Sequence, residues 1–201
     1  MQGTLKLYAI GILLAAASIR VCAQDAFTAV PVSNGINRLV LDGHDAITVR
    51  GWRENFNAHG FDVVSIYIRD GIGDHAGSWS VVPIFRQQSS ADHEDLQVIA
   101  TGGADCQLDD FRLLTTENGK RVQIILGTRD PGTSYAAAAT VRFDFYVLTQ
   151  NTDGTPGYPT HYFKWQRSQR SLARYCDVNE AFDRELNLGT SSGAERPGNV
   201  H

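Results

Sequence analysis

The sequence predicts a mainly β protein, an antiparallel β-sandwich-like domain that ends in one short C-terminal α-helix. Apolar and polar residues alternate with a period of two along several short segments, which is the pattern of half-buried strands. Glycine, aspartate and asparagine separate these segments, as they do in sandwiches and barrels. One stretch near the C-terminus instead combines a helix cap with apolar residues spaced four apart.

Alternation is clearest in residues 140–148. There Val141, Phe143, Phe145 and Val147 fall on one face of a strand, and Arg142 and Asp144 point the other way. Residues 61–68 are apolar on both sides, as in a central strand that is covered on both faces. Further strands are expected at 27–32, 37–42, 46–52, 79–85, 95–100, 111–115, 121–126 and 161–165.

Turn and breaker residues refine this pattern. Asn118-Gly119 is the strongest hairpin signal in the chain, because both residues tolerate the positive φ angles of a type I′ turn. Pro83 cannot donate to a β-ladder, so it predicts an edge or a bulge in its segment. Ile47 and Val49 form the apolar pair that shares one face of its strand.

The helix is predicted to follow Asp177. This residue suits the N-cap position, and Glu180 three residues later completes a capping box in which aspartate takes the Ser/Thr role. Gly189 can adopt the left-handed conformation that ends a helix. The apolar stripe of the helix consists of Val178, Phe182 and Leu186, with Ala181 beside it.

The N-terminus has the layout of a secretory signal peptide. Lys6 precedes an apolar run shorter than the about 20 residues of a membrane span, and Val21 and Ala23 are the small residues of a cleavage site. The alternatives are a buried N-terminal helix and, through Cys22, a lipoprotein, for which Val21 is a poor match. We therefore expect a signal peptide at 1–23, one β-rich domain at 24–189 and a disordered tail at 190–201.

Charge argues against nucleic acid as a partner. Cleavage after Ala23 removes Lys6 and Arg20 and no acidic residue, which leaves 16 basic and 22 acidic side chains without a basic stripe. No later apolar run is long enough to span a membrane. We therefore expect an exported protein without nucleic-acid binding and without a membrane span. Unpaired edge strands make a homodimer through a sheet edge a further expectation.

Two cysteines remain after cleavage, Cys106 and Cys176, and in an oxidising compartment they predict one disulfide. The bridge would close a loop of about 70 residues, for which the chain-entropy model gives about 3 to 5 kcal/mol. A zinc site would need further cysteines or histidines nearby, and neither cysteine has them. A nucleophilic thiol would need a basic neighbour, whereas Cys106 has three aspartates within four residues.

No hydrolase or metal motif accompanies this predicted fold. The chain lacks the motifs G-x-S-x-G, H-E-x-x-H and S-x-x-K, and its histidines are scattered. Residues 70–77 and 151–157 are faintly similar to calcium loops, but both lack the alternating acids and the closing glutamate of an EF-hand, so we interpret them as turns. We expect no catalytic residue, no metal and no other cofactor.

One polar segment stands out, GWRENFNAHGFDVV at residues 51–64. It places an arginine, a glutamate, two asparagines, a histidine and two aromatic residues in the turn between two strands. One interpretation is a structural corner, in which the amides and the histidine satisfy backbone groups. The other is a polar recognition surface at the end of a sheet, where loops carry binding.

Three segments, taken together, resemble the carbapenem self-resistance proteins of CarG type. They are RENFNAHGFDVVSIYI, GGADCQLDDFRLL and YCDVNEAFDRELNLG, in this order and at this spacing behind a signal peptide. The resemblance covers roughly residues 35 to 189, and none of the segments is a catalytic signature. It implies a periplasmic protein that protects its host from a carbapenem without hydrolysing it, by binding the drug or near its target.

The resemblance carries over no set of functional residues, so the candidate site follows from the chemistry of the drug. Arg53 could pair with the carboxylate of a carbapenem in a charge-assisted fork, and the neighbouring amides and histidine could donate to the lactam carbonyl. Glu54 or Asp62 would be the alternative, internal partners of Arg53. The alternative functions are a structural or interaction module of the envelope and an unrecognised hydrolase. The candidate ligand-binding residues are Arg53, Asn55, Asn57 and His59.

We predict that the protein has no β-lactamase turnover, because it lacks S-x-x-K and clustered zinc ligands. Increasing concentrations of purified protein should leave the lactam absorbance of a carbapenem, and of a chromogenic cephalosporin, at the background rate of decay. A loss of absorbance that scales with protein concentration would contradict this prediction. If a chelator then abolished that loss, a metal site among the histidines and aspartates would be the cause.

Overall fold

The structure is a computed structural model that describes residues 26–57, 59–69, 71, 76–86, 94–103 and 106–189. These residues form two β-sheets and a short C-terminal helix, so the predicted fold class is confirmed. All strand pairs are antiparallel except one. The predicted signal peptide at 1–23 and tail at 190–201 lie outside the described residues.

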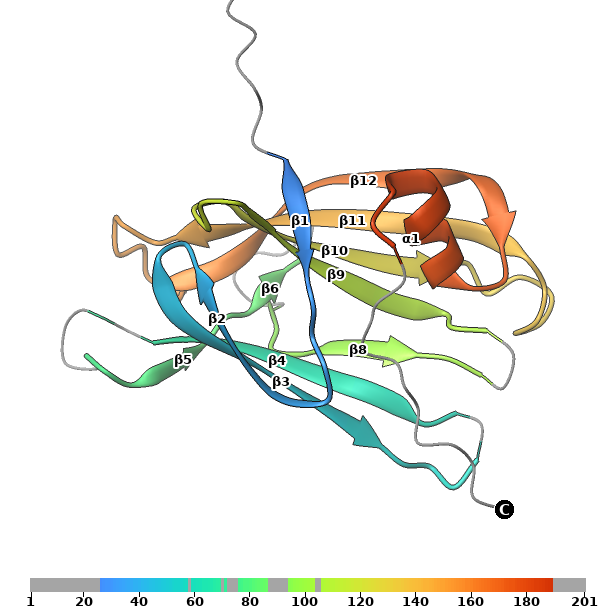
Figure 1. Cartoon of the computed structure of the whole chain (residues 1–201), viewed down its shortest axis with the longest axis horizontal. Coiled ribbons are helices and arrows are strands. Elements are labelled where there is room, and N and C mark those ends of the chain that lie inside the picture. The colour runs from blue at the N-terminus through green and yellow to red at the C-terminus, as the bar shows by residue number, and fades with distance from the viewer. Residues whose placement is uncertain are drawn as a thin grey trace, which may run out of the picture.

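The larger sheet has seven strands (Figure 1). Its single parallel pair joins the long last strand to a two-residue strand from the middle of the chain. In sheet order the strands are β1 (Phe27–Val30), β9 (Asp109–Thr116), β10 (Val122–Arg129), β11 (Ala139–Gln150), β12 (His161–Tyr175), β6 (Ile84–Phe85) and β7 (Glu94–Asp95).

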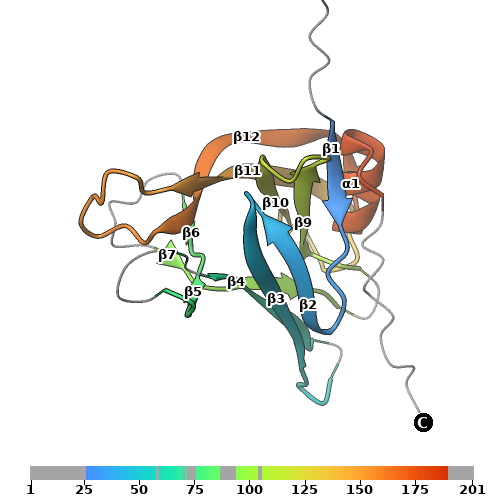
Figure 2. The same ribbon diagram turned by 60° about the vertical axis from the view of Figure 1, so that its left-hand side comes forward.

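The smaller sheet has five strands, and its centre is β4, which pairs with three of the others. It packs against one face of the larger sheet, and helix α1 (Val178–Leu186) covers the opposite face of that sheet (Figures 1 and 2). The strands are β2 (Gly35–Leu41), β3 (His44–Arg53), β4 (Phe61–Arg69), β5 (Trp79–Val81) and β8 (Val98–Thr101).

The interior consists of two apolar clusters, one on each face of the seven-stranded sheet. Val141, Phe143 and Phe145 share one face of β11, as predicted, and that face packs against the helix. The cluster between the sheets includes Leu41, Val64, Ile66, Ile68, Phe111, Leu113, Ile124, Tyr146 and Phe163. The cluster beneath the helix consists of Leu114, Ile125, Val141, Phe143, Phe145, Tyr175, Val178, Ala181 and Phe182.

Strand β3 turns its polar residues inward. Thr48 and Arg50 are buried between the sheets, whereas the apolar pair Ile47 and Val49 lies on the outer face of the five-stranded sheet. The expectation that residues 61–68 are covered on both faces is also wrong. Only one face of β4 is buried, and its other face belongs to the same half-exposed outer surface.

The two-residue hairpin lies elsewhere than predicted. Strands β9 and β10 do form a hairpin, but only Gly119 has a positive φ, of 70°, so the type I′ assignment of this turn is wrong. Asp42-Gly43 joins β2 to β3, with φ angles of 50° and 81°. Asp-Gly is the sequence that a type I′ turn favours, and its positive φ values match that turn.

Further strand boundaries differ from the prediction. The strand predicted at 95–100 is divided between β7 in the larger sheet and β8 in the smaller one. Between β5 and β6 the chain leaves the smaller sheet for the larger one. Pro83 lies at this crossing, outside both strands, so its missing N–H group removes no hydrogen bond from either ladder. Strand β12 continues to Tyr175 rather than ending at residue 165. Its second half is polar and largely exposed, and its pairing with β11 extends to Tyr175 and keeps it in the sheet.

Helix α1 begins as predicted and ends two residues earlier. The Asp177 carboxylate accepts a hydrogen bond of 2.7 Å from the Asn179 amide, which confirms the N-cap. Glu180 forms an ion pair of 2.9 Å with Arg184 instead of closing a capping box. Asn187, with φ 54° and ψ 40°, is the left-handed C-cap, a conformation that asparagine tolerates better than most residues.

The predicted disulfide between Cys106 and Cys176 is confirmed, with Cα atoms 5.7 Å apart. Next to it, the Val178 amide donates to the Gln107 carbonyl oxygen at 3.0 Å. The bridge and this bond attach the start of the helix to the segment that leads into β9. No helix within the described part of the chain is long and apolar enough to cross a membrane.

The disulfide should be a main contributor to stability. Mass spectrometry under non-reducing conditions should show one peptide pair joining Cys106 to Cys176 and no free thiol at either position. Cys176→Ser should lower the free energy of unfolding by about 2–5 kcal/mol, the usual cost of losing a native bridge. As a control, reducing the unmodified protein should lower its stability to that of the variant, and two alkylatable cysteines in native material would refute the prediction.

Candidate functional site

The polar segment singled out in the sequence is the corner between β3 and β4. Arg53 and Phe61 pair in register as the last residues of the hairpin, and residues 54–60 connect them. In both ribbon views this end of the hairpin lies at the margin of the molecule, and α1 lies beyond the other sheet (Figures 1 and 2). The corner therefore lies on the side of the molecule away from the helix layer.

The Glu54 carboxylate organises the corner. It accepts hydrogen bonds from the Trp52 indole at 3.1 Å and from the backbone amides of Asn55 at 2.8 Å and Phe56 at 2.6 Å. The bond from Trp52, together with those from the two amides, lowers the pKa of the Glu54 carboxyl. An ionised carboxylate is the form that accepts these three bonds, so the turn is best formed above that pKa.

The two asparagines close the turn from within. The Asn55 side-chain amide donates to the His59 carbonyl oxygen at 2.7 Å, and the His59 amide donates to the Asn57 side-chain oxygen at 2.8 Å. These bonds fit the interpretation of a structural corner, because side chains replace the backbone partners that a loop lacks. The His59 ring points to another loop, where its centroid lies 5.4 Å from that of Tyr135.

Arg53 differs from its neighbours because its side chain is exposed to solvent and has few contacts. Its guanidinium carbon lies 5.6 Å from the centroid of the Phe61 ring, and its Nη1 donates to the Glu54 carbonyl oxygen at 3.3 Å. Neither predicted internal carboxylate forms an ion pair with it within the described residues. The Glu54 carboxylate accepts from Trp52 and two backbone amides, and Asp62 pairs with Arg50.

Arg50 supports the corner from inside and was not anticipated from the sequence. Only 4% of its side chain is exposed; its Nη2 pairs with the Asp62 carboxylate at 2.8 Å, and its Nη1 donates to the Val32 carbonyl oxygen at 3.1 Å. Burial alone would lower the pKa of Arg50, but the bond and charge of Asp62 outweigh it, so the pKa is raised. The sequence signal was that Arg50 falls on the face of β3 opposite to that of the apolar pair Ile47 and Val49.

A second loop reaches the corner from the larger sheet. Residues 130–138 join β10 to β11, and the buried Arg129 donates to the carbonyl oxygens of Ser134, at 3.2 Å, and Ala137. These contacts hold Tyr135, which is 63% exposed, against the His59 ring. Sequence reasoning missed Tyr135, although a lone aromatic residue in a loop of glycine, serine and alanine was a visible signal.

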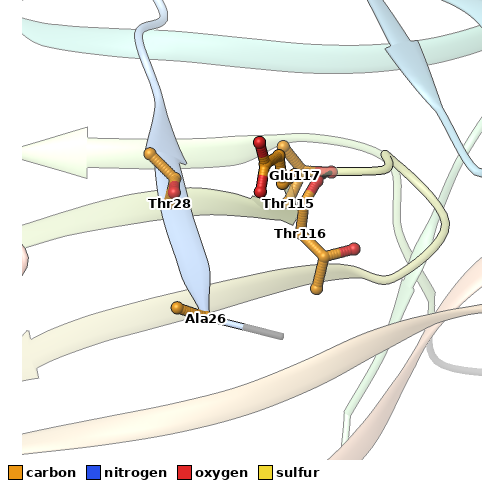
Figure 3. Close-up of a pocket in the computed structure, with 5 residues that line it drawn as sticks. All are labelled: Ala26, Thr28, Thr115, Thr116 and Glu117. Atoms are coloured by element: carbon orange, nitrogen blue, oxygen red, sulfur yellow. Dashed lines mark hydrogen bonds between the residues drawn. The ribbon is translucent and has the colours of Figure 1, made fainter. Parts of the chain in front are cut away.

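A small hollow of about 370 Å³ lies between the start of β1 and the end of β9 (Figure 3). It adjoins the β9–β10 turn, which contacts the start of the β2–β3 hairpin through a bond of 2.9 Å from the Asp42 amide to the Gly119 carbonyl oxygen. The corner lies at the far end of the ten-residue strand β3, about 30 Å away. The hollow is lined by Ala26, Thr28, Thr115, Thr116 and Glu117.

The chemistry available at the corner is recognition. Its polar groups comprise a guanidinium, an occupied carboxylate, two amides and one imidazole. Across the described residues, no group of three histidine, cysteine or acidic side chains is arranged to hold a metal ion. The arrangement can donate hydrogen bonds and stack, and it offers no activated nucleophile.

Arg50 and Arg53 lie three residues apart and should differ sharply in their effect on stability. Arg50→Ala should lower the free energy of unfolding by about 3–5 kcal/mol, because it leaves the Asp62 carboxylate without its buried partner. Arg53→Ala should cost only about 0.5–1 kcal/mol, the range of an exposed cation–π contact. Urea denaturation of both variants measures the difference, and equal losses would contradict this assignment of roles.

A solved structure of CarG superposes on this fold with a TM-score of 0.64. The superposition covers 81% of this chain and 99% of the CarG chain, with 18% sequence identity. No family model matches the sequence, and no curated protein matches it. At this level of identity the likeness concerns the fold alone, and the chain has a CarG-like arrangement of two sheets and a helix.

Proposed function

We propose that the protein is an exported, non-hydrolytic protection protein that gives its host tolerance to a carbapenem or another β-lactam. In this proposal it acts in the periplasm by binding the drug or by shielding its target, and the β3–β4 corner supplies the binding contact. The CarG-like fold and the resemblance of three sequence segments to that family support it. The single observation that carries it is the exposed Arg53 guanidinium, which has no acidic partner among the described residues.

Arg53 is suited to a carboxylate ligand by its geometry. A guanidinium has five N–H donors, and the structure assigns one of them to the Glu54 carbonyl oxygen. Stacking on Phe61 holds the group at the surface of the corner. A carboxylate that approaches from solvent can therefore find two parallel donors without displacing an internal ion pair.

The other three candidate residues have different parts in this proposal. Asn55 donates its side-chain amide within the loop, so its contribution is to shape the turn. The Asn57 side-chain oxygen accepts a hydrogen bond from the His59 amide and also shapes the turn. The Asn57 side-chain nitrogen and the His59 ring remain the groups that could donate to a lactam carbonyl. The ligand contact would then centre on Arg53, with Asn57 and His59 at its side.

The disulfide supports the proposed location. Bridges between cysteines persist in oxidising compartments such as the periplasm and are rare where thiols are kept reduced. The Cys106–Cys176 bridge attaches the helix to the sheets, so the domain depends on such a compartment for its full stability. An exported destination agrees with the signal peptide expected at residues 1–23.

The second candidate function is an envelope interaction module whose corner binds no drug. The internal bonds of Asn55, Asn57 and Glu54 favour it, because each is what a purely structural turn requires. Calorimetry with a carbapenem tests the drug-binding form of the first candidate, and heat of binding with one site per chain supports it. If no heat is observed, survival of the host under the drug with and without the gene separates target shielding from the module, which gives no protection.

Replacing Arg53 should weaken drug binding without unfolding the protein. Arg53→Ala should cost about 1.5–3 kcal/mol, the range for a hydrogen bond to a charged group, which is about tenfold to somewhat more than a hundredfold in affinity. Arg53→Lys should also lose much of the affinity, because lysine cannot reproduce the planar fork. Calorimetry, melting temperature, periplasmic protein level and protection should be measured together, with Arg184→Ala on the exposed face of α1 as the matched control.

The outcomes separate a binding role from a bracing role. A variant at Arg53 that melts like the parent, accumulates normally and still protects fully would sink the binding-site assignment. A variant that melts early and protects in proportion to its remaining amount would favour the structural corner. Weakened binding in a variant of normal stability and abundance is the result that the proposal expects.

A further inference from the structure

The corner exposes an aromatic side chain that has no packing role. Phe56 is 96% exposed, and its backbone has a φ of 56°, in the left-handed region. Aspartate and asparagine tolerate this region, whereas an aromatic residue adopts it only when its surroundings impose it. The described residues with positive φ other than glycine are Asp42, Phe56 and Asn187.

The surroundings impose this conformation through the Glu54 carboxylate. That carboxylate holds the Phe56 amide at 2.6 Å and is itself held by the Trp52 indole at 3.1 Å. The indole packs so closely over Gly60 that a Cβ atom there would collide with it. The corner is therefore built to keep one phenyl ring in solvent, and strained backbone of this kind gathers at functional sites.

Two more exposed aromatic residues accompany Phe56. Trp52 is 40% exposed, and Tyr135 is 63% exposed on the neighbouring loop, where it contacts the His59 ring. We call Trp52, Phe56 and Tyr135 the aromatic tip. Arg53 ends β3 three residues before Phe56, and its exposed guanidinium forms no ion pair among the described residues. Aromatic residues and arginine are the side chains most enriched at the energetic centres of protein–protein interfaces.

We propose that the aromatic tip docks into a folded protein partner, which offers an apolar socket for Phe56 and a carboxylate beside it for Arg53. A side chain that is 96% exposed protrudes, whereas small-molecule sites are concave. An anionic membrane surface would need a cluster of basic residues, and Arg53 is the one lysine or arginine between residues 51 and 68. This inference does not depend on drug binding by the corner.

The chain offers a matched control for the exposed phenylalanine. Leu172 is 97% exposed on β12, in the other sheet, and it belongs to neither loop of the aromatic tip. The test replaces Phe56, Tyr135 or Leu172 with p-benzoylphenylalanine in intact cells that carry the gene, followed by irradiation. The partner in the adduct is identified by mass spectrometry, and the complex is then rebuilt from purified components.

The inference expects one adduct, with the same partner, from positions 56 and 135 and none from position 172. With the purified partner, Phe56→Asn should weaken binding at least tenfold, and Leu172→Asn should leave it unchanged. The melting temperature of Phe56→Asn should stay the same or rise, because asparagine tolerates the left-handed conformation. A structural role for Phe56 would instead lower the melting temperature.

Several results would overturn the inference. They are the absence of an adduct at position 56, the same adduct at position 172, adducts only with a second copy of this chain or with lipid, and full affinity in Phe56→Asn. Failure of the drug-binding proposal looks different. In that case Arg53→Ala leaves carbapenem calorimetry unchanged, while the adduct at position 56 persists.

Discussion

The ion pair between Arg50 and Asp62 lies inside the β3–β4 hairpin and determines which face of β3 is buried. A buried guanidinium is costly to leave unpaired, so the hairpin keeps it inward against Asp62 and the Val32 carbonyl oxygen. Side chains alternate along a strand. With Arg50 inward, Arg53 three residues later must face outward, and the apolar pair of β3 must lie on the outer face. The position of the candidate site therefore follows from this one pairing.

Buried arginines attach the other outer elements in the same way. Arg129 holds the β10–β11 loop through two carbonyl oxygens, and Arg112 donates to the Asn179 side-chain oxygen at 2.7 Å while its guanidinium lies 4.4 Å from the Phe182 ring centroid. Arg112 pairs with an oxygen atom from a segment distant in sequence, and Arg129 with oxygen atoms of the loop that directly follows it, because a buried charge requires such partners. The disulfide adds a covalent link at the start of the helix. Loops and helix are thereby fixed on a two-sheet frame, which lets an exposed surface keep its shape.

Within the corner, the residues divide into two groups with different orientations. Glu54 and Asn55 direct their hydrogen bonds into the loop and shape it. Arg53 and Phe56 expose their side chains to solvent. This division reconciles the two interpretations of the segment, because the internal bonds of a structural corner are what hold the exposed groups in place. A rigid corner also loses less conformational entropy when it binds than a flexible loop would.

Local sequence was sufficient for features whose cause is local. Period-two alternation predicted the β class and the face of β11, an aspartate predicted the N-cap, and two cysteines in a chain that was expected to be exported predicted their bridge. It also located the corner, because so many polar side chains in one short turn are unusual. Only the tertiary structure decided that Thr48 and Arg50 face inward, that β12 extends to Tyr175, and that Tyr135 meets His59. These depend on contacts between elements: Asp62 and Val32 with Arg50, β11 with β12, and the loop of Tyr135, which Arg129 anchors locally, with the β3–β4 corner. Alternation shows which residues share a face, but the side that is buried depends on what packs against it.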